Sequence, residues 1–354
     1  MGERSDAPRF GVIVPCRNEA AVVRRRLENL ARLDWPQHGR PHRVVLVDDG
    51  SADATGELAR STCAELETTP GVRFEVLSNP GPHGKAHAMR LAIDALDDVD
   101  LLLLTDADVV FRPGTPQALA EAFRADPALA MACGAQEFVA SLPASGRESL
   151  DRSEFERAGE GYDFFTARVR ALESRAGRLF SVHGQCLCWR ADLGLRPLPG
   201  FAADDLDLRQ QARAAGGAVR LVPGARFLEE KIADAQERDR QALRRAEAYF
   251  QFVRRTPHAA GVDWLDRLHW RCYRHLPELS GWLGVPATIA LVAALTVWIH
   301  QSTGGGDIAY LEAAAVLLSG LLILRVHRVC RWIRLAGRRE RQSLLTDSWE
   351  TSRA

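Results

Sequence analysis

LLLLTDAD, residues 101–108, is the stretch that decides the fold class of this chain. Four consecutive leucines are typical of a strand that is buried on both faces, as in a parallel sheet covered by helices. The carboxylates of Asp106 and Asp108 follow this strand directly, at the end where open α/β sheets bind their ligands. Carboxylates in that place suit a hard divalent cation that takes further ligands from a phosphate. The alternative is a polar strand end with two solvated acids, because Asp-x-Asp is a short pattern.

Strand and helix patterns alternate from residue 10 to about residue 135, which predicts a parallel sheet with helices on both faces. The predicted strands are Phe10–Pro15, Arg43–Val47, Val72–Leu77 and Leu101–Leu104, and a later apolar run predicts one more over Leu179–Trp189. The predicted helices are Glu19–Arg32, Thr55–Leu66 and Lys85–Leu96, followed by a helical region over 150–175 and a charged helix over Asp234–Arg255.

Composition excludes some classes of protein. The 354 residues include 46 Lys+Arg and 46 Asp+Glu, so the net charge is zero, which argues against a general nucleic-acid binder. Seven cysteines without regular spacing predict no disulfide framework. The N-terminus has no apolar segment of the kind found in secretory signals, so we expect the N-terminal part to fold in the cytosol.

Two apolar segments near the C-terminus predict a membrane hairpin. Leu279–Ile299 carries no charge over 21 residues, and a helix needs roughly 20 apolar residues to cross the hydrocarbon core. A buried globular helix is the alternative for this segment. Ile308–Leu324 is shorter and carries Glu312, so it is the weaker candidate.

Arginines flank the predicted hairpin on both sides, whereas its turn, Ser302–Gly306, has no Lys or Arg. Positive residues stay preferentially on the cytoplasmic side of membrane helices, so both flanks are predicted to lie in the cytosol. The arginines after the second segment also favour anionic headgroups. The flanking arginines are Arg267, Arg271 and Arg274 before the first segment, and Arg325, Arg328, Arg331, Arg334, Arg338, Arg339 and Arg341 after the second.

Polar motifs follow the predicted strands in a fixed order. Carboxylates at successive strand ends can line one rim of a sheet, where a nucleotide diphosphate and its metal would bind. Lys85 near a helix start adds positive charge for a phosphate, as does the helix dipole. Neither a Walker sequence nor G-x-G-x-x-G follows a strand, which disfavours kinase-type and dinucleotide-type sites. The motifs are VPCRNE (14–19), VDDGSAD (47–53), GKAHA (84–88), DAD (106–108) and ADDLD (203–207).

This ordered set resembles the motifs of family 2 glycosyltransferases with the GT-A fold, over roughly residues 8–250. Pro-x-x-Asn-Glu matches 15–19, Asp-Asp-Gly-Ser-x-Asp matches 48–53, Gly-Lys-x-x-Ala matches 84–88, and Asp-x-Asp matches 106–108. The family's Glu-Asp pair is matched by Asp204-Asp205, where Asp replaces Glu. The resemblance implies an α/β fold, a GT-A Rossmann-like sheet, which here would be followed by C-terminal transmembrane helices.

The resemblance also implies roles for single residues. Asp205, with Asp204, takes the part of the catalytic base, and Asp207 lies close by in sequence. Asp106 and Asp108 hold Mg²⁺ or Mn²⁺. His183, Gly184 and Gln185 fall on the acceptor side. A further motif, Gln-x-x-Arg-Trp, matches at Gln241 and Arg244, but Arg245 stands where the family has Trp. The residues implied to bind the nucleotide sugar are Pro15, Arg17, Glu19, Asp49, Lys85, Asp106, Gln241 and Arg244.

The function implied is metal-dependent, inverting transfer of a single sugar to a membrane lipid or lipid-linked acceptor by a hexosyltransferase. A UDP-sugar donor is expected more than a GDP-sugar, and no nucleic-acid partner. The predicted location is the cell membrane, multi-pass, with the catalytic domain in the cytosol. The alternatives are a polysaccharide-synthase-like enzyme with a glycan acceptor, a sugar-nucleotide pyrophosphorylase and a non-catalytic scaffold. The predicted domains are a catalytic domain (1–255), an interfacial helical linker (256–278), the hairpin (279–326) and a basic cytosolic tail (327–354).

Overall fold

The computed structural model describes residues 7–150, 164–231, 234–256 and 263–277, together with the single positions 279, 286, 289 and 290. These residues form two compact units, the first reaching to Ala235 and the second beginning at Gln236. Within the part of the chain described, no helix has both the length and the apolar character needed to cross a bilayer. The predicted hairpin and basic tail lie outside the described residues, apart from those single positions.

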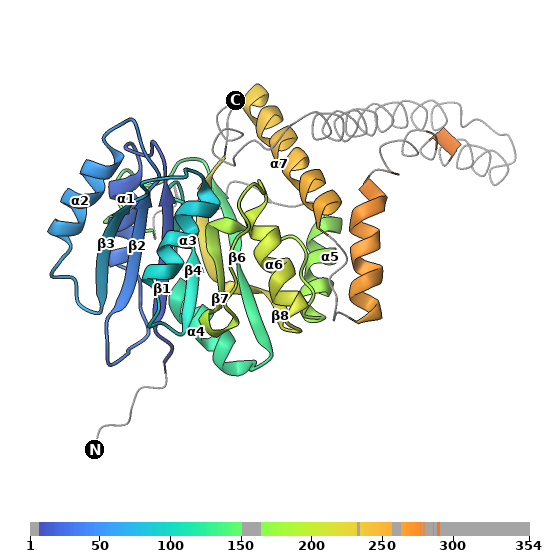
Figure 1. Ribbon diagram of the computed structural model, residues 1–354, viewed down its shortest axis with the longest axis horizontal. Coiled ribbons are helices and arrows are strands. Elements are labelled where there is room, and N and C mark those ends of the chain that lie inside the picture. Colours follow the sequence, from blue (N-terminus) through green and yellow to red (C-terminus); the bar gives the residue numbers. More distant parts are fainter. Residues whose placement is uncertain are drawn as a thin grey trace, which may run out of the picture. The chain divides into compact units, whose positions relative to one another are not determined.

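The first unit is built on an eight-stranded sheet with the order β3-β2-β1-β4-β7-β6-β8-β5 (Figure 1). The strands are β1 (Phe10–Cys16), β2 (His42–Asp48), β3 (Val72–Ser78), β4 (Leu101–Leu104), β5 (Val110–Phe111), β6 (Leu129–Val139), β7 (Leu187–Arg190) and β8 (Ala218–Glu230). The helices are α1 (Val23–Ala31), α2 (Thr55–Glu65), α3 (Lys85–Ala95), α4 (Thr115–Ala125), α5 (Phe164–Arg175) and α6 (Asp204–Ala214), with short 3-10 helices at Gly184–Cys186 and Ala191–Leu193.

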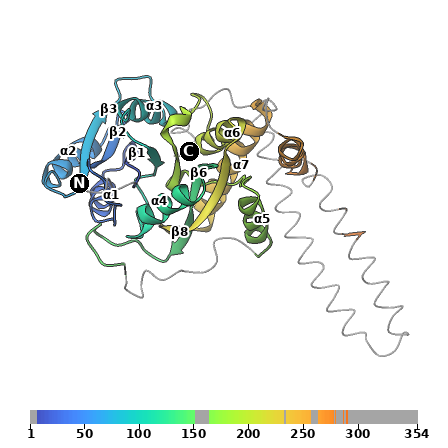
Figure 2. The ribbon, with the colours of Figure 1, turned by 90° about the horizontal axis from the view of Figure 1, so that it is seen from below.

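Helices cover both faces of the sheet, as the sequence predicts. Leu101 and Leu103 belong to one apolar core, which α1, α2 and α4 cover, whereas Leu102 and Leu104 belong to a second core under α3 and α6. Figure 2 shows α1 and α4 on one side of the sheet and α3 and α6 on the other. All four leucines are at most 3% exposed. The unbroken leucine run therefore arises because successive side chains of β4 enter opposite cores, and both cores are apolar.

The four predicted N-terminal strands are confirmed to within one residue at either end. The prediction of a parallel sheet is wrong for the second half. β7 runs antiparallel to both β4 and β6, and β5 runs antiparallel to β8. The sheet is mixed because the chain re-enters it beside β4 in the opposite direction.

Two predicted element boundaries are also wrong. The strand predicted from Leu179 begins only at Leu187, because a 3-10 turn precedes it at Gly184–Cys186. The helix predicted from Glu19 begins at Val23. Asn18 has a positive φ of 55°, a conformation that ends the extended chain in a turn before α1 starts.

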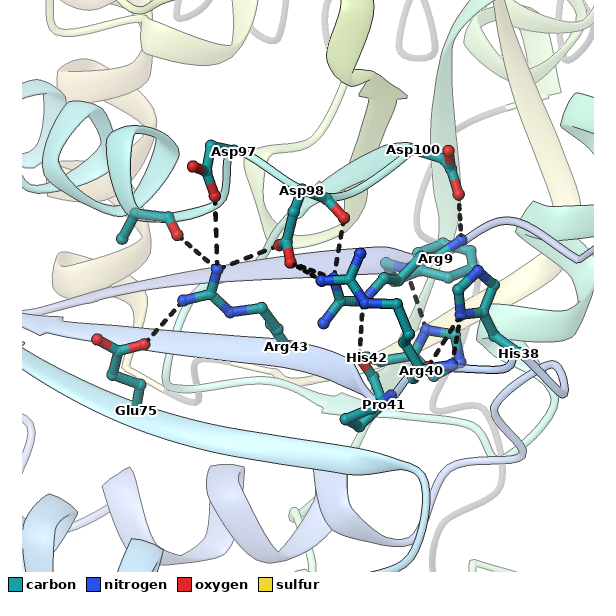
Figure 3. A network of polar contacts seen from close by, with 12 residues as sticks. Arg9, His38, Arg40, Pro41, His42, Arg43, Glu75, Asp97, Asp98 and Asp100 are labelled. Atoms are coloured by element: carbon teal, nitrogen blue, oxygen red, sulfur yellow. Dashed lines mark hydrogen bonds and ion pairs between the residues drawn. The ribbon is translucent and has the colours of Figure 1, made fainter.

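A network of charged side chains lies at the end of the sheet where β1, β2 and β4 begin (Figure 3). Asp98 accepts hydrogen bonds from Arg9, Arg40 and Arg43. Arg9, directly before β1, is 5% exposed, so its charge needs these partners. The network joins the start of β1 and of β2 to the segment before β4, and so fixes the three strands at one end.

α1 is pressed against the segment 142–150 with no space between their backbones. A Cβ added at Gly146 would lie 2.2 Å from Arg25 O and 2.3 Å from Asn29 N. Ser145 Oγ donates to Glu28 Oε2 at 2.7 Å, which closes the same contact. The backbone of the segment therefore supports α1 directly.

Gly146→Ala is expected to lower the free energy of unfolding by about 1–3 kcal/mol, because the methyl group meets backbone that cannot move aside. Chemical unfolding of the full chain in detergent measures this. Gly39→Ala is the matched control, since an added Cβ there has nothing within 4 Å. An equal, small effect of both substitutions would contradict the close approach.

In the second unit, α7 (Ala235–Arg255) packs against a helix over 264–277. Phe252 and Trp270 meet edge to face with ring centroids 5.4 Å apart, and the Tyr249 hydroxyl donates to Tyr273 O. Trp270 is 5% exposed and Trp264 is 64% exposed. The charged helix predicted over 234–255 is thus confirmed, and Trp270 is a packing residue within this unit.

Candidate active site

The first two motifs form turns that lock onto each other. Asn18 N donates to Ser51 Oγ at 2.9 Å, and Asn18 Oδ1 accepts from Ala52 N at 2.7 Å. Glu19 N donates to Thr55 Oγ1 at 2.7 Å. Thr55 N in turn donates to Asp53 Oδ1 at 3.0 Å. The Asn-Glu and Gly-Ser-x-Asp positions therefore shape the rim beyond β1 and β2, while Pro15, Arg17 and Glu19 stand on it.

Asp49 fastens β2 to the loop that leads into α3. Its carboxylate is fully buried and accepts from Gly84 N at 2.7 Å and from Asn79 Nδ2 at 2.5 Å, with His83 Nδ1 at 3.5 Å. Gly50 has a φ of 72°, and a Cβ there would lie 2.6 Å from the His83 ring, so the turn needs glycine. Asp49 thus sets the position of Gly84, the residue before Lys85. Asn79 and His83 carry no motif signal in the sequence.

Lys85 joins two acidic motifs that lie far apart in the chain. Its Nζ is 2.9 Å from Asp106 Oδ1, after β4, and 3.6 Å from Asp204 Oδ2, at the start of α6. Burial opposes the charge on Lys85, but the carboxylates of Asp106 and Asp204 outweigh it and raise its pKa. Lys85 therefore stays a cation between the carboxylates.

Asp205 lies beside this ion-pair cluster. A Cβ on Gly184 would lie 3.8 Å from Asp205 Cβ and 3.8 Å from Lys85 Nζ, so these three predicted site residues meet. Burial and the adjacent charge of Asp204 raise the pKa of Asp205 to about 7. A carboxyl group with a pKa near neutral is well suited to take up a proton and release it again.

Asp207 is separated from this cluster by its hydrogen bonds. Its Oδ2 accepts from Leu198 N at 2.8 Å and from Gln211 Nε2 at 3.0 Å, and the residue is 4% exposed. It anchors the loop before α6.

His183 N donates to Cys133 Sγ at 3.2 Å, and the His183 ring lies edge to face with the Phe227 ring, with 6.0 Å between the ring centroids.

The end of β4 offers a carboxylate for a divalent cation. Asp108 is exposed, yet the protein surrounds it closely enough that desolvation, with the charges of Asp106 and Glu229, raises its pKa to about 6. Such crowding of negative charge fits a cation. Within the described ranges no group of three or more His, Cys, Asp or Glu side chains could hold a metal. Mg²⁺ is commonly held by one or two carboxylates together with substrate phosphates, which agrees with this donor set.

Gln241 and Arg244 lie on α7 in the second unit. Their role in binding the diphosphate therefore stays a prediction.

Comparisons with known proteins identify the family and the fold of this chain. One solved structure that the chain resembles is a mannosyltransferase from Pyrobaculum calidifontis in complex with GDP-Man and Mn²⁺. The match has a TM-score of 0.63 and 21% identity, and covers 94% of this chain and 87% of that one. No curated protein matches in sequence. The family model described as "Glycosyltransferase like family 2" matches residues 8–248. This chain therefore belongs to glycosyltransferase family 2, and it is a glycosyltransferase with a GT-A-like fold.

Proposed function

We propose that this enzyme moves a single sugar, with inversion, from a nucleoside-diphosphate sugar to a membrane lipid or lipid-linked acceptor, and that it requires Mg²⁺ or Mn²⁺. One observation carries the proposal: Lys85 Nζ lies 2.9 Å from Asp106 and 3.6 Å from Asp204. This contact brings the donor motif at the end of β4 next to the proposed base at the start of α6. The reaction needs the donor-binding motif and the base close together, because both act at the same anomeric carbon.

The residues present can carry out a single displacement. Asp205 takes the proton of the acceptor hydroxyl while the hydroxyl oxygen bonds to the anomeric carbon. The bond from that carbon to the diphosphate oxygen breaks, and the nucleoside diphosphate leaves. Lys85 stabilises the negative charge that gathers on the leaving group. Asp108, with help from Asp106, would hold a divalent cation, which would further neutralise the diphosphate.

Support for a membrane acceptor comes from the second unit. The helix over 264–277 exposes Trp264 at 64%, Leu268 at 50% and Leu276 at 58%. Arg267 and Arg271 are exposed on the same helix. Large apolar side chains beside arginines suit the boundary between headgroups and acyl chains. The uncharged stretch 279–299 follows in the sequence. We therefore propose a membrane location with the catalytic domain in the cytosol.

The donor nucleotide is proposed more broadly than the sequence predicts. UDP is the expected nucleotide, but the solved mannosyltransferase holds GDP-Man with Mn²⁺, which does not favour UDP. At 21% identity the likeness is one of fold. The proposal therefore includes both UDP-sugars and GDP-sugars.

The test is to incubate the full chain in native membranes with labelled UDP- and GDP-sugars and Mn²⁺ or Mg²⁺, and then to extract the lipids. Release of nucleoside diphosphate with label in the lipid fraction supports the proposal. Label found only in soluble glycan favours a glycan acceptor. Pyrophosphate release would indicate a pyrophosphorylase, and no release of either product with any donor would favour a scaffold.

The pH profile is expected to report the proposed base. Asp205, whose pKa is about 7, works only when it is deprotonated, so kcat/KM should fall as the pH drops through about 7. Initial rates at fixed Mn²⁺ between pH 5.5 and 8.5 measure this range, which is chosen to span roughly 1.5 units either side of the pKa. A profile that stays flat down to pH 5.5 would contradict the assignment.

A further inference from the structure

Arg26, on α1, is a charged residue at a buried position where an apolar side chain would pack without the desolvation cost of a charge. It has no exposed surface, and it lies in the first core among residues such as Val23 and Leu27. Burial lowers the pKa of Arg26 to about 9. Replacing a buried ion by an apolar side chain is often neutral or stabilising, so the fold alone does not require arginine here.

The guanidinium group of Arg26 binds both sides of the Asp-x-Asp motif. Nη2 donates to Thr105 Oγ1 at 2.5 Å, directly before the motif, and Nη1 donates to Val109 O at 3.4 Å, directly after it. The group also lies 4.0 Å from the centre of the Phe111 ring. Among the described residues, Arg26 Nε has no hydrogen-bond partner. The two terminal nitrogens of the fork are therefore those that hold the loop.

Asn29 continues this clamp one turn further along α1. Arg26 Nη1 donates to Asn29 Oδ1 at 2.7 Å. Asn29 in turn accepts from Phe111 N at 2.9 Å and donates to Phe111 O at 3.0 Å, which are the backbone groups of β5. Side chains from one helix thus fix both ends of residues 105–111. The close contact of α1 with Gly146 keeps the helix itself in place.

We infer that Arg26 is a positioning residue, which holds the Asp106–Asp108 loop in the shape that receives the metal and the diphosphate of the donor. The inference rests on the proposed function, because it concerns the same donor site. A loop fixed before the ligand arrives loses less entropy on binding. Arg26 also places a positive charge beneath two carboxylates that would otherwise repel each other.

The test compares Arg26→Met, Arg26→Lys and Thr105→Val in the full chain. Thermal unfolding shows whether each variant folds, titration calorimetry measures Mn²⁺-dependent binding of GDP and UDP, and kinetics separate kcat from KM. Substitution of groups that orient metal ligands typically costs about 10- to 100-fold in affinity or activity, and that loss is expected for Arg26→Met. Arg26→Lys keeps the charge without the fork, so its loss should be smaller than that of Arg26→Met.

Thr105→Val removes only the hydroxyl that Arg26 binds. It therefore tests the same contact even if Arg26→Met does not fold. Thr105→Val should weaken Mn²⁺-dependent nucleotide binding. In the double variant with Arg26→Met, the fold-loss in affinity should be smaller than the product of the two single fold-losses, because both substitutions break the same contact. Arg24→Met is the control, because Arg24 lies on the same helix but pairs with Glu65 on the surface.

Wild-type binding in Thr105→Val, or in a folded Arg26→Met, would overturn the inference. Losses that multiply in the double variant would also overturn it. Failure of the proposed function appears separately. If the wild type releases no nucleoside diphosphate from any donor, the calorimetric comparison of Mn²⁺-dependent nucleotide binding still reports on Arg26.

Discussion

Asp205→Asn is expected to lower kcat by about 10²- to 10⁴-fold while the enzyme still binds nucleoside diphosphate and Mn²⁺. The amide cannot accept the proton of the acceptor hydroxyl, so the attacking oxygen stays a poor nucleophile. The substitution is otherwise conservative, because the amide oxygen can still accept from Leu206 N, which lies 2.8 Å from Asp205 Oδ1. Single-turnover rates and calorimetry on the same preparation separate the two effects.

Asp97→Asn is the matched control for this experiment. Asp97 is an 84% exposed carboxylate in the network around Arg43, at the other end of the sheet. Its loss should change neither turnover nor binding. If Asp205→Asn turns over at the wild-type rate, another group takes the proton.

Asp108→Ala is expected to reduce Mn²⁺-dependent binding of the nucleoside diphosphate by roughly 100-fold or more, since one of two carboxylates available to the cation is lost. Desolvation and neighbouring negative charge raise the pKa of Asp108, so at neutral pH its removal relieves repulsion and should not lower the free energy of unfolding. Titration calorimetry with and without Mn²⁺ measures the loss.

The comparison without metal makes the Asp108 result specific. Weak, metal-independent binding should be the same in Asp108→Ala and in the wild type, because the other residues of the rim are untouched. Asp97→Ala again serves as the control. Mn²⁺-dependent affinity that survives in Asp108→Ala would remove this carboxylate from the metal site.

Local pattern was enough to predict the first half of the sheet. Each of β1 to β4 is an apolar run bounded by turn residues, and a helix follows each of the first three. The second half could not be predicted in the same way. β7 is four residues long and lies between β4 and β6, which are distant in sequence. Its direction depends on where the chain re-enters the sheet, and no local pattern encodes that.

The candidate site shows the same division. The motif residues Lys85, Asp106 and Asp204 are brought together as the ordered motifs suggested. The residues that support them were missed. For Arg26 a signal existed, since it falls on the same face of α1 as Val23, Leu27 and Leu30, where a charge is out of place. Asn79 and His83 gave no signal, because their partner Asp49 is reached only through the fold.

The pairing of β5 with β8 has a consequence for biosynthesis. Val110 and Phe111 follow the Asp-x-Asp motif at once, yet their partners in the ladder are Leu228 and Phe227. Closing the long loop between β5 and β8 costs conformational entropy, and this cost is offset only when the strands of the ladder have paired. While the ribosome is still adding residues before Phe227, the far side of the donor motif has no strand beside it. The nascent chain can therefore pair β5 only after most of residues 1–235 have been translated.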